Sequence, residues 1–139
     1  MDIVFAIDAS DYMGATNFKT AIRSVEMFTE RLYIHPDFVR VGIVSYHKAL
    51  TIAPFLRDSL SNQVVTQALQ IHKFKGGTPD LASTLRLLRM KVFHVSNGAR
   101  PGIPKVGGHI LLHCIIFSTL HENYKPVDEC PPFSRLPIY

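Results

Sequence analysis

The chain has 139 residues, of which 47% are hydrophobic and 19% charged, as in an ordinary globular protein with enough sequence to bury one core. Fifteen Lys and Arg against eleven Asp and Glu give a formal net charge of +4, and because the basic residues are scattered this charge does not argue for nucleic acid as a partner. No apolar run reaches the roughly 18 residues that a membrane-spanning helix needs, so we expect no membrane span.

The amino-terminal residues do not follow the pattern of a secretory leader, since Asp2 follows Met1 and strand-like sequence starts at once. The chain is then either cytosolic or a segment without its natural start. The two cysteines, Cys114 and Cys130, are too few to define a disulfide framework. Burial of Cys114 as a small hydrophobe is the favoured interpretation, and a Cys114–Cys130 bridge is the alternative.

The first half of the chain alternates strand and helix patterns. DIVFAID, residues 2–8, is a continuous apolar run typical of a strand that is covered on both faces. An amphipathic helix is predicted over residues 18–34, before Pro36. VRVGIVSY, residues 39–46, predicts a second strand. ALTIAPF, residues 49–55, follows after two residues, a gap too short for a crossover helix, and therefore predicts an antiparallel edge strand.

The second half continues the alternation. A short helix is predicted over residues 59–71, and GGTPDLASTLRLLRMKVF predicts another helix, with Thr78 as its N-cap and Pro79 in its first turn. HILLHCIIFS, residues 109–118, predicts a last strand. The elements together predict an α/β fold with a doubly wound, Rossmann-like open sheet, mostly parallel, with one antiparallel edge strand. The inward stripe of the helix that starts in GGTPD is predicted to be Leu81, Leu85, Leu88 and Val92.

Oxygen-bearing side chains gather where the first strand ends. Asp8 and Ser10 lie on one loop, and Thr78 lies on a second loop that an open α/β sheet brings to the same edge. One carboxylate and two hydroxyls are ligands that Mg²⁺ accepts, with water completing the shell. The alternative is that Asp8 and Ser10 make local turn bonds and Thr78 caps its helix.

Five segments of the chain resemble a von Willebrand factor type A domain, most closely those repeated in collagen type VI chains. They are DIVFAIDASD, the amphipathic helix, VRVGIVSY, KGGTPDLASTL and GARPGIPK, in the family's order and spacing over about residues 2–106. The resemblance implies that residues 1–106 form the first part of such a domain. Residues 107–139 are then a divergent segment, with a strand over 109–118 and a Pro-rich tail, so that the fold is incomplete at its C-terminus.

The resemblance identifies Asp8, Ser10 and Thr78 with the family's metal-ion-dependent adhesion site. Two departures argue that this site is degenerate. Tyr12 stands where the family has a second serine, and its phenol is expected to displace the metal or the loop. The family's Thr-Asp-Gly is absent, with Ser118 and Thr119 near its expected place. A site with one carboxylate should bind Mg²⁺ weakly, and no other cofactor is implied.

The resemblance implies a non-catalytic adhesion and protein-interaction module of the extracellular matrix. Its partners would be matrix proteins such as collagens, including other collagen chains, and its location would be extracellular. The loss of the family's final units predicts an uncovered fourth strand and marginal stability. A truncated, differently spliced or non-functional gene product is a further alternative.

Two enzyme or metal interpretations compete with the adhesion module. A Mg²⁺-dependent hydrolase or phosphotransferase would use Asp8 as its nucleophile, but such enzymes need a second acid where this chain has Ser10. A zinc site would need His109, His113, Cys114 and His121, whose spacing fits no zinc motif. The basic residues Arg86, Arg89, Lys91 and Arg100 are expected to form a solvated face.

Overall fold

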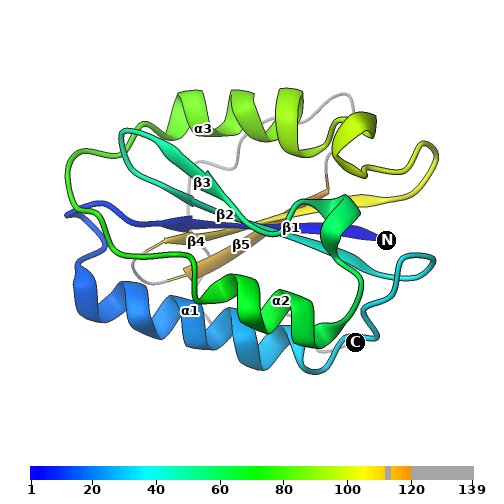
Figure 1. Cartoon of the computed structure of the whole chain (residues 1–139). Helices are drawn as coiled ribbons and strands as arrows, with labels where there is room; N and C mark the ends of the chain where they lie inside the picture. The colour runs from blue at the N-terminus through cyan, green and yellow to red at the C-terminus, as the bar shows by residue number, and fades with distance from the viewer. Residues whose placement is uncertain (112–113, 120–139) are drawn as a thin grey trace.

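The fold is built around one five-stranded sheet. The computed structural model describes residues 1–111 and 114–119 of the chain. Strand β1 lies at the centre and runs parallel to β2 and β4, while β3 and β5 pair antiparallel at the two edges, in the order β3-β2-β1-β4-β5 (Figure 1). The strands are β1 (Asp2–Asp8), β2 (Arg40–Tyr46), β3 (Leu50–Ile52), β4 (Lys105–Leu111) and β5 (Cys114–Thr119).

The predicted open α/β sheet is confirmed, including the antiparallel edge strand β3. The opposite edge differs from the prediction, because the apolar run over 109–118 is divided between β4 and β5, which pair from Leu111 with Cys114 to Val106 with Thr119. No Gly, Pro, Asn or Asp stands between Leu111 and Cys114 to signal the break. The fourth strand is therefore not an uncovered edge. The sheet continues past residue 106 through β5, so the structure shows no boundary there. The division into residues 1–106 and 107–139 stays a prediction about where the sequence departs from the family pattern.

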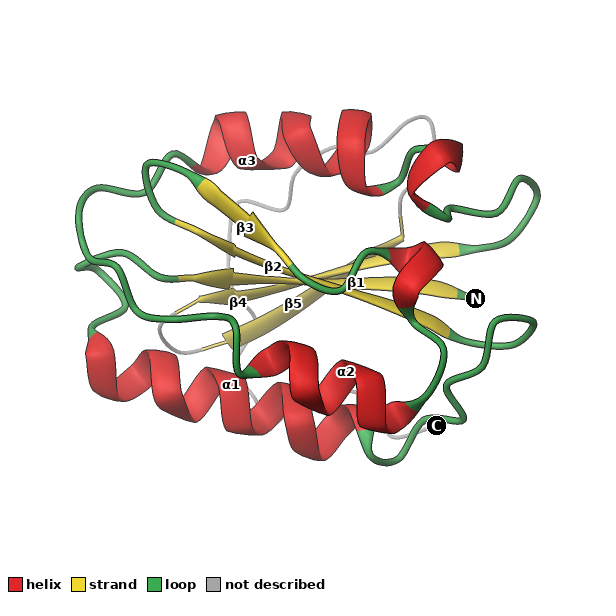
Figure 2. Ribbon diagram, viewed as in Figure 1, coloured by secondary structure: helices red, strands yellow, loops and turns green. Residues whose placement is uncertain are grey.

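Helices cover the two faces of the sheet. Helices α1 (Ala15–Thr29) and α2 (Asn62–Leu69) pack on one face, and α3 (Leu81–Leu87) lies on the other, followed by helical turns at Leu88–Val92 and Val95–Asn97 (Figure 2). Within the described residues, no helix is both long enough and apolar enough to cross a membrane.

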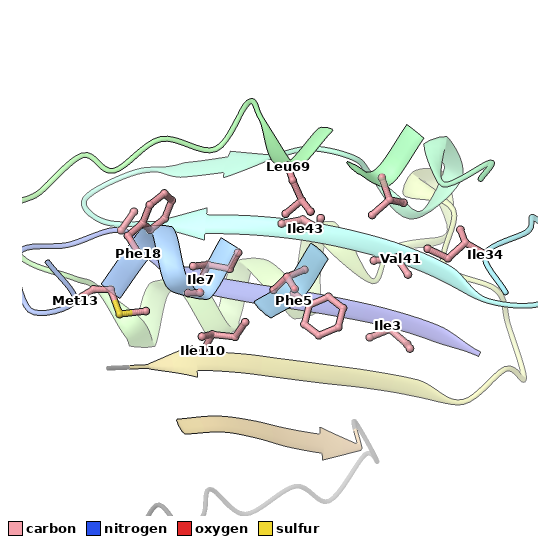
Figure 3. Close-up of a cluster of buried hydrophobic side chains, with 14 residues drawn as sticks. Ile3, Phe5, Ile7, Met13, Phe18, Ile34, Val41, Ile43, Leu69 and Ile110 are labelled. Carbon is pink, nitrogen blue, oxygen red and sulfur yellow. The ribbon is translucent and has the colours of Figure 1, made fainter. Parts of the chain in front are cut away.

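Strand β1 supplies both cores. All seven of its residues are buried, as predicted for a strand covered on both faces. Ile3, Phe5 and Ile7 join the cluster under α1 and α2 that Figure 3 shows. Val4 and Ala6 join the cluster under α3. This period of two is the geometry of a strand, in which successive side chains point to opposite faces.

Helix α3 begins later than predicted and buries a different stripe. Asp80, not Thr78, is its N-cap, because the Asp80 carboxylate accepts a hydrogen bond from the Ser83 N–H at 2.9 Å. Leu81 and Leu85 are each 40% exposed, whereas Thr84 is buried. Burial of this threonine costs little because its hydroxyl donates to the Asp80 carbonyl at 2.7 Å. Leu88 and Val92 are buried as predicted, on a turn with π-helical geometry.

Helix α1 is also displaced from its predicted range. It begins at Ala15 after Gly14 and ends at Thr29, several residues before Pro36. The chain between the helix and β2 instead makes turns and an isolated bridge from Ile34 to Val39. Apolar residues in this connection extend the helical period without being helical.

A buried ion pair closes the end of the sheet where β1 begins. Asp2 is fully buried, and its carboxylate accepts hydrogen bonds from Arg100 Nη2 at 2.7 Å, Nε at 2.9 Å and the backbone N–H at 2.8 Å. The same guanidinium donates to the carbonyls of Asp37 and Phe38, both at 2.8 Å. Arg100 therefore joins β1, the connection to β2 and the loop before β4, and does not belong to the predicted solvated basic face.

We expect Arg100→Ala to lower the free energy of unfolding by about 3 kcal/mol, because it leaves the buried Asp2 carboxylate without its partner. Urea denaturation followed by circular dichroism measures the change. Arg23→Ala, on the exposed side of α1, is the matched control and should change stability by less than about 0.5 kcal/mol. Equal stability of the two variants would contradict the assigned role of Arg100.

A buried histidine links α2 to the β2–β3 edge. His72 is 4% exposed, and its two ring nitrogens lie 2.8 Å from Ser45 Oγ and 2.7 Å from the Ala53 carbonyl oxygen. Burial lowers the pKa of His72 below its ordinary value of 6.5, although the hydrogen bond to Ala53 opposes this shift. The folded chain therefore holds this imidazole neutral.

Stability should fall as the pH drops below about 6.5, because the unfolded chain then binds a proton at His72 that the folded chain does not. The loss contributed by this one group has an upper limit of about 1.4 kcal/mol per pH unit. Urea midpoints measured at neutral and mildly acidic pH test it. His72→Gln should show a flatter pH dependence than the unmodified chain, and an unchanged slope would exclude His72 as the cause.

Candidate functional site

The candidate site begins where β1 ends. Asp8 is 6% exposed and Ser10 is fully buried. Asp8 Oδ1 accepts a hydrogen bond from the Ser10 N–H at 2.8 Å, which turns the chain sharply after the strand. Within the described part of the chain, Ser10 Oγ has no hydrogen-bond partner. A buried hydroxyl in this condition costs about 1–3 kcal/mol, so the site holds an oxygen that a ligand or a water would stabilise.

A second loop docks against the first. The Ala9 carbonyl accepts hydrogen bonds from the N–H groups of Lys75 at 3.2 Å and Gly76 at 2.9 Å. Asp11 and Gly77 are joined twice, since the Asp11 N–H donates to the Gly77 carbonyl at 2.9 Å and the Asp11 carboxylate accepts from the Gly77 N–H at 2.8 Å. The segment between α2 and α3 is thereby held at the carboxyl ends of the strands (Figure 1).

Gly76 and Gly77 are required at this junction. Both have positive φ, +72° and +82°, which side-chain-bearing residues rarely adopt. A Cβ on Gly76 would also lie 2.7 Å from the Asp11 carboxylate. The GG pair in the sequence indicates this turn. The hydrogen bond between the Gly77 N–H and the Asp11 carboxylate was not predicted, because a local pattern does not show a contact between residues 66 apart.

The structure brings together only some of the predicted site residues. Asp8 and Ser10 come together in a buried turn, and the loop that carries Thr78 docks beside them, while the Thr78 side chain is exposed. The sequence predicted that the Tyr12 phenol would displace the metal or the loop. Tyr12 is instead 71% exposed, so its phenol does not occupy the site. Thr119 pairs with Val106 at the amino end of β4. Ser118 and Thr119 therefore lie near the amino ends of the parallel strands, away from the predicted place of the missing acid at their carboxyl ends.

Tyr46 is a further member of the site that the sequence did not reveal. It ends β2 opposite Asp8, is 1% exposed, and its carbonyl accepts the Ala9 N–H at 2.8 Å. Burial raises the pKa of the Tyr46 phenol, and the negative charge of Asp8 raises it further. The phenol is therefore neutral and cannot act as a base at physiological pH.

The residues present fit a loosely held hard cation better than a tight one. Among the described residues, no group of three or more His, Cys, Asp or Glu is arranged to hold a metal. Asp8 supplies the single carboxylate, and the unpartnered Ser10 Oγ supplies one hydroxyl. Mg²⁺ can be held through one or two carboxylates with several waters, so this donor set is compatible with weak binding. Of the alternative zinc residues, His113 and His121 lie outside the described residues, as does Cys130 of the disulfide alternative.

Comparison with known families decides the identity of this arrangement. The family model of the von Willebrand factor type A domain matches residues 2–108, which include β1, both helical layers and the start of β4. The chain belongs to the von Willebrand factor type A domain family. This confirms the predicted resemblance, with collagen VI as one relative among several.

The relatives of this type A domain are much longer proteins. The chain is 32% identical over 105 residues to von Willebrand factor A domain-containing protein 2 of Mus musculus, covering 76% of this chain and 13% of that protein. It is 27% identical to matrilin-1 of Gallus gallus, covering 77% of this chain and 22% of the relative. For the collagen alpha-4(VI) chain of Mus musculus the identity is 29%, and the shares are 76% and 5%. The chain therefore spans a small part of each.

A solved structure supports the fold. Proximal thread matrix protein 1 from the mussel byssus, described with a zinc-occupied MIDAS motif, superposes with a TM-score of 0.66 at 22% sequence identity. The match covers 76% of this chain and 27% of the mussel protein. At this identity the likeness shows a shared type A fold.

Ser10→Ala should leave the metal-free chain equally stable or more stable by about 1 kcal/mol, because it removes a buried hydroxyl that finds no partner among the described residues. Ser45→Ala is the matched control, since Ser45 is equally buried but is bonded to His72, and it should destabilise by about 1 kcal/mol. Thermal unfolding in a chelator measures both. A destabilised Ser10→Ala variant would mean that the hydroxyl is already satisfied.

Proposed function

We propose that this type A domain is a non-catalytic adhesion and protein-interaction module of the extracellular matrix. Family membership over residues 2–108 carries the proposal, and relatives such as matrilin-1 and the collagen alpha-4(VI) chain support a matrix setting. The partners proposed are matrix proteins, collagens and other collagen chains among them, and the proposed location is extracellular. No role with nucleic acid is proposed.

The chemistry of the candidate site supports a binding role over catalysis. Asp8 has one oxygen committed to the Ser10 N–H, and its neighbour Tyr46 is a neutral phenol. A phosphotransferase needs a second acid or base within hydrogen-bond reach of the nucleophile, and position 10 offers a buried hydroxyl instead. A hydrolase or phosphotransferase remains the rival function, and a phosphatase assay with and without Mg²⁺ separates the two.

The proposed metal site is degenerate. Asp8, Ser10 and Thr78 are the residues that would hold a hard cation, which would supply positive charge to an acidic group of a partner. With a single carboxylate the ion should dissociate readily, so adhesion should not depend on it. The docking of the Thr78 loop supports this view, since the hydrogen bonds between Asp11 and Gly77 join the two loops directly.

We expect the purified chain to bind immobilised collagen VI or matrilin saturably, and EDTA to reduce this binding by less than about twofold. Surface plasmon resonance in EDTA, Mg²⁺ and Zn²⁺ buffers measures the effect, with Zn²⁺ included because the mussel protein is described with it. Ser10→Ala should bind as the unmodified chain does. Binding that EDTA abolishes would contradict the degenerate site, and the absence of saturable binding to any matrix protein would contradict the adhesion role.

A further inference from the structure

A groove beside the candidate site is not used by the proposed metal chemistry. It lies between the β2–β3 turn and helix α3, and its volume is about 290 Å³. The turn contributes residues 47–49, β3 contributes Leu50 and Ile52, and the helical layer contributes residues from Asp80 to Lys91. Both walls belong to regular elements or to the three-residue turn 47–49, so the groove is part of the folded framework.

The charge of the groove is mainly positive. Lys48 and Lys91 line it from opposite walls, both exposed, and His47 lies next to them. The one acidic residue in the lining, Asp80, is committed to capping α3 through the Ser83 N–H. That hydrogen bonding lowers the pKa of Asp80, and nearby Arg86 contributes to the same shift. Two lysine ammonium groups therefore face the groove against a single carboxylate whose charge already has a local donor.

Part of the groove's lining is apolar. Leu50 and Ile52 of β3 and Leu87 of α3 line it, and each is only half-buried. A surface that combines half-buried aliphatic side chains with flanking ammonium groups complements a peptide that carries both apolar and acidic side chains. A sulfated polysaccharide would use the lysines but would leave the aliphatic residues uncovered.

The groove is continuous with the candidate site. A Cβ at Gly77 would lie 3.7 Å from Lys48 Cε, so the Lys48 side chain runs along the loop that carries Thr78. The Asp80 N–H donates to the His47 carbonyl at 3.4 Å, which ties the β2–β3 turn to the start of α3. A partner seated in the groove would therefore also contact the loops at the carboxyl ends of the strands.

We propose that this groove binds a short acidic peptide segment of a protein partner, with its carboxylates at Lys48 and Lys91 and an apolar side chain over Leu50, Ile52 and Leu87. The inference rests on the proposed adhesion function, because it names the chemistry of the partner at the same edge of the fold. It differs from metal-dependent adhesion in that lysine ammonium groups, and not a bound cation, supply the positive charge.

Fluorescence anisotropy with a labelled peptide of alternating glutamate and leucine tests the proposal in EDTA at about 150 mM salt, where exposed charges are well screened. The K48E/K91E variant should bind this peptide at least about tenfold more weakly than the unmodified chain. The matched control K19E/R23E makes the same change in net charge on exposed positions of α1, on the other face of the sheet, and should stay within about twofold. Peptides with glutamate replaced by glutamine, or leucine by glycine, should both bind more weakly.

In the peptide assay the proposal is overturned by no binding of the acidic peptide, by equal weakening in K48E/K91E and K19E/R23E, or by stronger binding of a sulfated oligosaccharide than of the peptide. The same variants on immobilised matrix protein separate this inference from the adhesion function. If K48E/K91E binds matrix protein as well as the unmodified chain does, the groove inference fails and the adhesion function stands. If the peptide binds as expected and no matrix protein does, the adhesion function fails alone.

Discussion

The complete burial of β1 is the constraint on which the rest of the structure depends. A strand with no exposed residue needs a sheet neighbour on each side and a helical layer on each face, and β2, β4, α1 and α3 meet these needs. Its two ends are the only places where polar groups enter. Asp2 is neutralised by Arg100 at one end, while Asp8 at the other end faces the loops that carry the candidate site.

These two ends illustrate opposite treatments of a buried carboxylate. Asp2 receives three hydrogen bonds from a single arginine and is fully compensated, which makes it structural. In the part of the chain that the structure describes, Asp8 receives one backbone hydrogen bond, and its neighbours are the unpartnered Ser10 hydroxyl and the neutral Tyr46 phenol. Incomplete compensation at a strand end leaves capacity for a ligand, whereas the complete compensation of Asp2 leaves none.

Sequence patterns predicted what depends on local periodicity and missed what depends on distant contacts. The central strand, the antiparallel β3 and the junction at Asp8 and Ser10 follow from apolar runs and spacing. The break between β4 and β5 lacked a turn residue, and the buried stripe of α3 differs because a π-helical turn and a satisfied Thr84 override the leucine pattern. The sequence did not reveal the pairing of Tyr46 with Asp8, the hydrogen bonds between Asp11 and Gly77, or the ion pair of Arg100 with Asp2. Each of these contacts joins residues far apart in the sequence, which a local pattern does not record.

The register of β5 fixes where the last described strand ends relative to the candidate site. Ile3 and Thr119 both pair with Val106. The first strand therefore begins, and the last described strand ends, at the amino ends of the parallel strands. The loops with Asp8, Lys48 and Thr78 lie at the carboxyl ends of these strands. Asp2 and Thr119 therefore lie at one pole of the domain, and the candidate site lies at the opposite pole, remote from both of these positions.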